Sequence, residues 1–476
     1  MGINRLLTTA LALLILLSAG TAAQAETEVK MSGDFRLHMN SWTNYNFTGR
    51  DPTGTMVAQP LSIYERFQLQ SDFVTNENLK FRFQARLNDA AWGKALAVDN
   101  PPVAVQVSNA YLIFTVPNTS VEVDAGYQNW QNPVSSYFAG GLVLDTQVAA
   151  LAVTAPIVAD TFALKFGYLR PRNTYSDFAP NTTGGMANVD VFYLAGALTT
   201  DPINITPWAA YGLIGREADL SPSSIGAHLS PAIPATVGLP AAWGNDSNSA
   251  FWLGAAIEVK ALDPVKFYAD VIYGNAASGD HSYDARRGWF MDAALEYNGL
   301  ELMTPSVWGY WSSGDTGGIS GGSQRLPYLV SSWNAGGSFL FNDDAGEWYN
   351  DKMSVSQVGS WGLGITFDKI TFIKDLSHRL TFNFVNGTNS PQSLREGILL
   401  GGIGTYYGMG NDIATSEWVY GVSLDNKYMI YENLAMYANL GWAHGNFDSS
   451  IWGRSFVNLA QNGDVWRVLL GFKYTF

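Results

Sequence analysis

The chain contains no cysteine and few charged residues, and these absences exclude several classes of protein. Its 476 residues include no Cys and 5 His, and 14% of them are charged. Without Cys the chain has neither a disulfide framework nor a thiolate site for metal or redox chemistry. The formal net charge of −14 argues against a nucleic-acid partner, which selects basic surfaces. We therefore expect no nucleic acid and no resident cofactor.

Long apolar runs are also missing from most of the chain. After residue 25 no stretch holds 18 consecutive apolar residues, so the sequence predicts no membrane-spanning helix there. The apolar run 6–17 follows Arg5 and leads into small residues, which is typical of a secretory signal peptide over residues 1–25. The mature protein is then exported and begins at Glu26.

Aromatic residues and a two-residue alternation are what the chain has in abundance. It contains 16 Trp, 23 Tyr and 25 Phe. In the last stretch, 464–476, large apolar residues occupy every second position as far as Phe476. The same period recurs upstream, where Leu79, Phe81 and Phe83 alternate with polar residues. One apolar face and one polar face suit a strand with lipid on one side and a wet lumen on the other.

The connections between these alternating segments support the same fold. Short turns such as 76–78 alternate with long loops rich in Gly, Ser, Asn and Asp, such as 215–249. We therefore predict an all-β protein over residues 26–476, a transmembrane antiparallel up-and-down β-barrel of 16–18 strands with 18 as the best count. It has short periplasmic turns and long extracellular loops. We expect one strand at 355–368, followed by a longer connection at 369–378.

Three stretches resemble a known family. The segments YERFQLQ (64–70), NDAAWG (88–93) and VDAGYQNW (123–130) are similar to the outer-membrane homotrimeric porins of sulfate-reducing bacteria. The C-terminal strand resembles the strand that the barrel assembly machinery reads in such proteins, with Phe476 as its terminal signal. The resemblance implies a homotrimer in the bacterial outer membrane that acts as a diffusion channel.

The resemblance also implies a constriction. In trimeric porins the third long loop folds inward, and by order along the chain that loop lies near 129–145. We expect arginines of the first strands to face acidic residues across the pore, which would create a transverse field that orients polar solutes. The alternative is that these charges merely solvate an inner wall. The candidate pore-lining residues are Arg36, Arg66, Arg82, Arg86, Glu122, Asp124, Tyr137 and Asp145.

The function predicted from these features is a water-filled porin for passive diffusion of ions and small hydrophilic solutes. The alternative is a substrate-specific channel for a sugar or a small organic anion, with a pore lined by aromatic residues. Candidates for such a lining are Tyr64, Tyr111, Trp252 and Trp311. An enzyme is not expected, because Ser449, His444 and Asp448 lie within one loop without the pattern of a catalytic set.

Other partners follow from the outer-membrane assignment. We expect contacts with outer-membrane lipids and lipopolysaccharide, besides the assembly machinery and two further copies of the chain. One long loop carries acidic residues that could bind Ca²⁺ loosely, but their spacing does not match an EF-hand, so we predict no metal site. These residues are Asp343, Asp344, Glu347 and Asp351.

Deletion of Phe476 should sharply reduce the yield of folded barrel. The deletion removes the terminal aromatic residue of a lipid-facing row and, by the resemblance, part of the assembly signal. Heat-modifiable migration of the membrane fraction on gels measures the folded form. A normal yield from the truncated chain would show that the terminal residue is dispensable.

Overall fold

The computed structural model describes most of the chain. The described residues are 27–49, 61–91, 105–173, 188–215, 248–277, 285–318, 322–341, 353, 355–401, 408–461 and 463–476. The expected signal peptide (1–25) and the four acidic residues between 343 and 351 lie outside these ranges.

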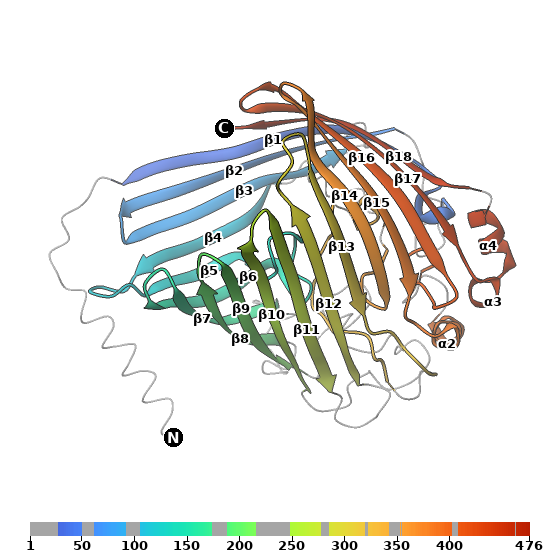
Figure 1. Cartoon of the computed structure of the whole chain (residues 1–476). Helices are drawn as coiled ribbons and strands as arrows, with labels where there is room; N and C mark the ends of the chain where they lie inside the picture. The colour runs from blue at the N-terminus through green and yellow to red at the C-terminus, as the bar shows by residue number, and fades with distance from the viewer. Residues whose placement is uncertain are drawn as a thin grey trace, which may run out of the picture.

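Eighteen strands of the described residues form one antiparallel sheet (Figure 1). Each strand pairs with the next along the chain, and β18 pairs with β1, so the sheet closes into a barrel. The predicted all-β barrel and its best count of 18 strands are confirmed. The strands are β1 (Glu28–Thr43), β2 (Ser62–Asn76), β3 (Leu79–Ala91), β4 (Val105–Thr115), β5 (Glu122–Gln131), β6 (Asp145–Val158), β7 (Phe162–Asn173), β8 (Asn188–Thr199), β9 (Ile203–Ile214), β10 (Asn248–Leu262), β11 (Val265–Ala277), β12 (Arg286–Tyr297), β13 (Thr304–Ser312), β14 (Ser360–Ile373), β15 (Leu376–Gly387), β16 (Trp418–Tyr431), β17 (Leu434–Asn446) and β18 (Val465–Thr475).

Short helices occupy the long connections. They are η1 (Tyr45–Phe47), η5 (Phe339–Phe341), α2 (Pro391–Gly401), α3 (Ser449–Trp452) and α4 (Arg454–Gln461). Among the described residues no helix has the length and apolar character to cross a membrane.

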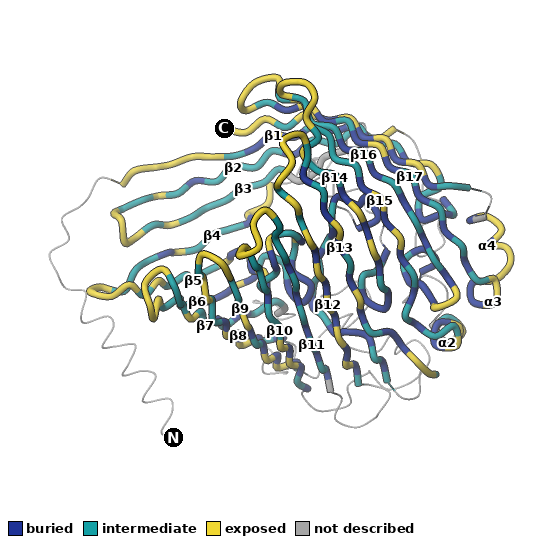
Figure 2. Tube along the Cα trace, in the orientation of Figure 1, coloured by how far each residue is buried: buried dark blue, intermediate teal, exposed yellow. Residues whose placement is uncertain are grey.

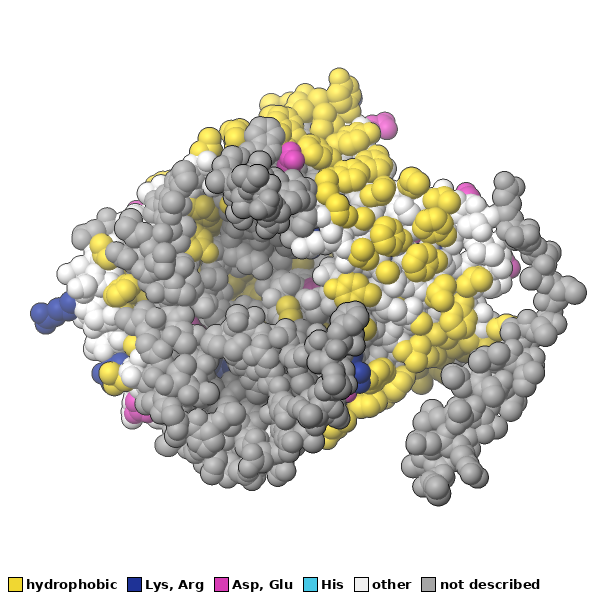
Figure 3. Space-filling model, turned by 180° about the vertical axis from the view of Figure 1, so that it is seen from behind, with side chains coloured by type: hydrophobic (Ala, Val, Ile, Leu, Met, Phe, Trp, Pro, Cys, Tyr) yellow, Lys and Arg dark blue, Asp and Glu magenta, His cyan; other side chains and the backbone are white. Residues whose placement is uncertain are grey.

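The alternation of the sequence becomes an inside and an outside of the barrel. Along β12, residues are buried and exposed in strict turn, so Phe290 is buried while Trp289 and Met291 are exposed. The exposed positions are apolar on strand after strand. Figure 3 shows hydrophobic side chains spread over the outer wall, with few charged side chains among them. The outer surface of this barrel is therefore hydrophobic, whereas its inner surface carries the polar groups.

Short and long connections lie at opposite ends of the barrel, as predicted. Figure 2 shows the short turns exposed at one end, and the helices α2, α3 and α4 lie at the other end. The expected connection at 369–378 is wrong, because β14 continues to Ile373 and β15 begins at Leu376. Irregular register within this pair, between Phe367 and Ile370 and again before Ile373, broke the two-residue alternation that marks a strand in the sequence.

The C-terminal residue completes the closing strand pair. Phe476 donates its N–H to Gly33 O at 3.1 Å, and Gly33 N donates to Phe476 O at 2.9 Å. The Phe476 ring lies against Phe67, with ring centroids 6.1 Å apart, and over Gly33, where a Cβ atom would come within 2.7 Å of the ring. A glycine in β1 thus makes room for the terminal aromatic side chain.

Replacing Gly364 with Ala should destabilise the barrel. Gly364 of β14 lies opposite Trp308 of β13, and an added Cβ would overlap the indole ring, which is 1% exposed. Overpacking of this kind costs about 1–3 kcal/mol. The measurement is the temperature at which the folded barrel loses its heat-modifiable migration. Gly317→Ala is the control, because nothing lies within 4 Å of its Cβ position; equal melting of the two variants would contradict the packing argument.

Candidate functional site

The third long loop, here called loop L3 (residues 132–144), lies against the inner wall of the barrel. Ser135 donates from its backbone N–H to Asp270 Oδ1 at 2.8 Å and from its hydroxyl to Asp270 Oδ2 at 2.6 Å. Ser136 N donates to Glu258 Oε1 at 2.7 Å. The Tyr137 hydroxyl lies 2.8 Å from Ser306 Oγ. These contacts bind loop L3 to β10, β11 and β13, across the barrel from its own strands β5 and β6.

The seventh long loop also enters the barrel. Its described inner segment, here called segment L7 (residues 322–341), pairs with loop L3 through backbone hydrogen bonds. Leu329 N donates to Val143 O at 2.8 Å, and Ser332 N donates to Gly141 O at 3.0 Å. Residues Ala139 and Asn334 form an antiparallel bridge. The two inward segments are therefore joined to each other as well as to the wall.

Segment L7 has its own attachments to the wall. Trp333 Nε1 donates to Asp292 Oδ2 at 2.8 Å. Phe339 N donates to Ser423 Oγ at 3.1 Å, and Thr381 Oγ1 donates to Gly336 O at 2.8 Å. Because these partners lie on β12, β15 and β16, segment L7 covers the inner face of that side of the barrel.

An aromatic cluster fills the space between the two inward segments and the wall. The Trp333 ring lies 5.6 Å from Phe138 of loop L3, 5.2 Å from Phe290 and 5.1 Å from Tyr310, measured between ring centroids. Phe341 packs against both Trp333 and Tyr310. Aromatic contacts of this kind bury a large area and contribute beyond it. This half of the lumen is a packed core rather than an open passage.

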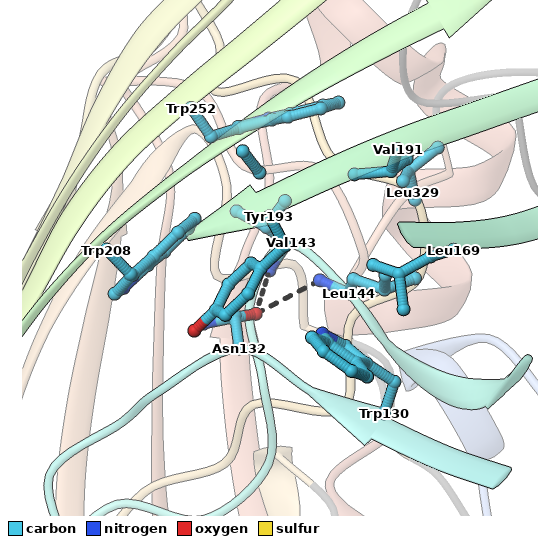
Figure 4. Close-up of a pocket in the computed structure, with 11 residues that line it drawn as sticks. Trp130, Asn132, Val143, Leu144, Leu169, Val191, Tyr193, Trp208, Trp252 and Leu329 are labelled. Atoms are coloured by element: carbon cyan, nitrogen blue, oxygen red, sulfur yellow. Dashed lines mark hydrogen bonds between the residues drawn. The ribbon is translucent and has the colours of Figure 1, made fainter. Parts of the chain in front are cut away.

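A small cavity lies beside this core, between loop L3 and strands β7 to β10. It is lined by Trp130, Tyr193, Trp208 and Trp252 (Figure 4). The Asn132 side chain also borders it and accepts hydrogen bonds from Val143 N and Leu144 N, which joins the first and last residues of loop L3. Its lining is apolar, and it has room for about one water molecule. It is a packing defect and not a solute site.

The opposite wall carries the predicted arginines. Arg36 Nε and Arg66 Nη2 lie 3.0 and 3.1 Å from the same oxygen of Asp34, and both arginines are less than a tenth exposed. Lys473 of β18 is in register with Arg36, which is in register with Arg66. Three cations thus sit side by side on β18, β1 and β2, with one carboxylate bound between two of them.

Arg82 and Arg86 line the same wall on β3. Arg82 makes a bidentate pair with Asp72, at 2.7 Å for both Nε and Nη2. For Arg86, which is half-buried, the structure gives no ion pair among the described residues. A paired arginine contributes little net charge to the lumen, so Arg86 carries more of the field than Arg82 does.

The acidic candidates do not face the arginines across the pore. Glu122 and Asp124 lie on β5, two strands from β3, so they belong to the same wall. Asp145 lies at the end of loop L3, where its carboxylate accepts from Gly141 N at 3.1 Å and from the Ser332 hydroxyl. The predicted opposition of these three acids to the arginines is wrong, because β5 and β6 follow β3 within three strands around the sheet and so lie on the same side of the barrel.

The aromatic candidates are scattered. Trp311 is 42% exposed on the outer surface, so its prediction as a lumen residue is wrong. Trp252 points inward but is buried, with Nε1 donating to Pro327 O at 2.8 Å. Tyr64 stacks on His38 at 5.3 Å, and the Tyr111 hydroxyl lies 3.5 Å from Arg82 Nη1. These four side chains do not form a continuous row down one wall.

The sequence did not point to the residues that hold the inward segments. Asp270, Asp292 and Glu258 were not predicted as site residues, and neither was Trp333. The two aspartates occupy lumen-facing positions in strands whose alternate residues are apolar, such as Phe290-Met291-Asp292-Ala293. A lone acidic residue at an inward position is the signal that could have identified them. No group of three or more potential metal ligands occurs in the described part of the chain.

A buried carboxylate joins the long loops near the entrance on the loop side. Glu417, which is 0% exposed, accepts from Ala414 N at 2.8 Å, Asp448 N at 2.8 Å and Trp452 Nε1 at 2.6 Å. Burial raises the pKa of Glu417 to about 7, and these hydrogen bonds partly oppose the shift. Glu417 therefore connects the loop before β16 to α3.

The comparisons with known proteins agree with the fold. The chain is similar to the outer membrane protein OprD from Pseudomonas aeruginosa, with 13% identity, coverage of 96% of this chain and 97% of that one, and a TM-score of 0.51. OccD3 (OpdP) and OccK8 (OprE) of the same organism each share 12% identity and a TM-score of 0.50; each match covers 96% of this chain, and 94% and 99% of those chains. No family model and no curated protein matches the chain. At this identity the likeness shows the barrel fold.

The attachment of α3 should weaken as pH rises. The pKa of Glu417 is raised from 4.5 to about 7 when α3 is attached, so the attached form binds one more proton than the detached form between these pH values. That contribution to stability is complete below 4.5 and is lost as pH rises through about 7. Asp448, whose pKa is lowered, keeps its charge across this window.

Amide hydrogen exchange of Ser449–Trp452, corrected for intrinsic rates, measures this effect. We expect roughly a 25-fold larger opening equilibrium at about pH 8 than at about pH 5.5. Glu417→Gln should remove the pH dependence, because its amide does not titrate. A wild-type opening equilibrium that does not change over this range would refute the linkage.

Proposed function

We propose that the chain is an outer-membrane porin through which ions and small hydrophilic solutes diffuse passively. The observation that carries this proposal is the division of the lumen: a packed half formed by loop L3 and segment L7, and a charged, partly exposed wall opposite it. A barrel filled by side chains throughout would be a structural protein, and an empty one would be unselective. A half-filled barrel is a constricted channel.

The outer surface supports the membrane location. Exposed large hydrophobic side chains occur on the outer faces of most strands, among them Phe166, Leu194, Leu253 and Phe472. So much exposed apolar surface is incompatible with a water-soluble monomer and suits a lipid-facing band. The closed sheet satisfies the backbone groups that lipid cannot. The expected signal peptide at 1–25 would bring such a chain across the inner membrane.

The solute path runs along the wall formed by β2 to β5. The inward residues of β2 to β5, such as Gln68, Arg82 and Tyr111, are half-buried, whereas those of β10 to β16, such as Trp308 and Thr381, are buried beneath the inward segments. Loop L3 presents Ser136 and Ala139, which are exposed, on the other side of this path. Loop L3 and segment L7 together therefore narrow the channel.

A preference for small organic anions is the second candidate function. Arg86 supports it, because it is a half-buried cation on the lumen wall with no ion pair among the described residues, and such a cation attracts carboxylates. A sugar channel has less support, since the aromatic side chains of the lumen are scattered. No reaction is proposed: His444 pairs with Asp464, and Asp448 caps α3, so these residues serve the loops.

The assembly and partners are part of the same proposal. We place the chain with the homotrimeric porins of sulfate-reducing bacteria on the sequence resemblance given above. A homotrimer, insertion by the barrel assembly machinery, and contacts with outer-membrane lipids and lipopolysaccharide go with that resemblance. The exposed aromatic end of β18, Tyr474 and Phe476, is consistent with an insertion signal. Loose binding of Ca²⁺ would involve the acidic residues between 343 and 351.

The purified protein should conduct ions in planar bilayers, and Arg82→Gln with Arg86→Gln should shift its selectivity toward cations. The double change leaves Asp72 without its partner and removes the cation of Arg86, which has no ion pair among the described residues, so the path becomes more negative. The shift in reversal potential under a salt gradient should grow as salt is lowered, because screening weakens.

Arg287→Gln is the matched control, since Arg287 is an exposed arginine on the outer side of β12. It removes one positive charge away from the path and should leave the reversal potential unchanged. Absence of conductance in the wild-type protein would refute the porin function. An equal shift from the control would show that overall charge, and not the arginine wall, sets selectivity.

A further inference from the structure

Two buried aspartates face each other directly on neighbouring strands. Asp270 of β11 is the cross-strand partner of Asp292 of β12, and each is 4% exposed. Like charges directly opposite each other destabilise a sheet, and a buried carboxylate is costly unless it is hydrogen-bonded. A barrel wall that places both there requires a compensating set of donors, and the inward segments supply it.

Each aspartate binds a different inward segment. Asp270 accepts three hydrogen bonds from Ser135 of loop L3, two from the backbone N–H at 2.8 and 3.1 Å and one from the hydroxyl at 2.6 Å. Asp292 accepts from Trp333 Nε1 of segment L7 at 2.8 Å. The two anchors are themselves linked, because Asp270 N donates to Asp292 Oδ1 at 3.0 Å.

The segments bound by this pair are also bound to each other. Besides the bridge between Ala139 and Asn334, Asp145 N donates to Val330 O at 3.0 Å, and Phe138 stacks on Trp333 at 5.6 Å. A displacement of loop L3 from Asp270 would therefore pull on Trp333. The other L3 contacts, Ser136 with Glu258 and Tyr137 with Ser306, touch that loop alone.

We propose that Asp270 and Asp292 are positioning residues that hold loop L3 and segment L7 in the lumen as one unit, and thereby set the width of the solute path. The inference rests on the proposed function, because the width matters only if solutes pass. The solute does not touch these two acidic side chains, yet they determine how narrow the constriction is. Loosening either anchor should loosen both segments.

Single-channel recording of Asp270→Asn and Asp292→Asn tests this proposal. Each change replaces a carboxylate oxygen, which accepts a hydrogen bond, with an amide NH₂, which cannot. The equilibrium constant between the anchored and the loosened arrangement of the segments should therefore fall about tenfold. The expected result is a higher mean conductance and current fluctuations within the open state that exceed those of the wild type. The two single variants and the double variant should resemble one another, since the anchors act as a unit.

Glu296→Gln is the matched control. Glu296 is another acidic side chain of β12 on the lumen side, bound to Asn298 at 2.9 Å and to no residue of either inward segment. Its neutralisation removes a carboxylate from the same wall without touching either inward segment, so it should add no fluctuations. Fluctuations in this control equal to those of Asp270→Asn would overturn the proposal, because charge and not anchoring would then explain them.

A covalent replacement of the anchor provides a rescue. The chain has no cysteine, so Ser135→Cys with Asp270→Cys introduces the only thiols. The oxidised pair should conduct as quietly as the wild type, and reduction should restore the fluctuations of Asp270→Asn. Fluctuations that persist in the oxidised form would count against the anchor. If Asp270→Asn does not fold, Ser135→Ala removes one of the three hydrogen bonds and should give a smaller effect of the same kind.

The inference and the porin function fail in different ways. Quiet, unchanged currents in both aspartate variants, with a conducting wild type, would refute the inference alone. A wild type that does not conduct would refute the porin function. In that case, amide hydrogen exchange of residues 132–144 still tests the anchor: faster exchange in Asp270→Asn than in Glu296→Gln supports it, and equal exchange overturns it.

Discussion

The barrel exists because β18 pairs with β1. This pairing runs from Asp34 opposite Thr475 to Thr43 opposite Trp466, and Phe476 extends it to Gly33. Without it the sheet would have two open edges whose N–H and C=O groups lipid cannot satisfy. Closure also creates an inside, and every functional argument about this chain concerns what that inside contains.

The inside is divided by charge as well as by packing. Cations of β18, β1, β2 and β3 line one wall, whereas Asp270 and Asp292 lie beneath the inward segments on the other. The carboxylates do not serve the path directly, because their oxygens already accept from Ser135 and Trp333. One wall of the barrel thus faces the solute path, and the other binds the segments that narrow it.

The strands could be predicted closely, and the inward-facing residues only in part. Where apolar and polar residues alternate, as in Leu79, Phe81 and Phe83, the period alone assigns the two faces. In β13 the run Val307-Trp308-Gly309-Tyr310-Trp311 is apolar throughout, so no period marks the inside. Trp308 and Tyr310 are buried in the lumen because segment L7 covers them, and Trp311 faces outward.

The sequence by itself determined that this is a barrel of alternating strands with short connections at one end and long ones at the other, because both depend on neighbours along the chain. The tertiary structure alone decided which charges face each other and which loops enter the lumen. Glu122 lies two strands from Arg82 on the same wall, and Ser135 reaches Asp270 across the barrel. Such contacts depend on which strands lie opposite each other in the closed sheet and on where long loops bind. Neither can be recognised from the alternation of residues along a single strand.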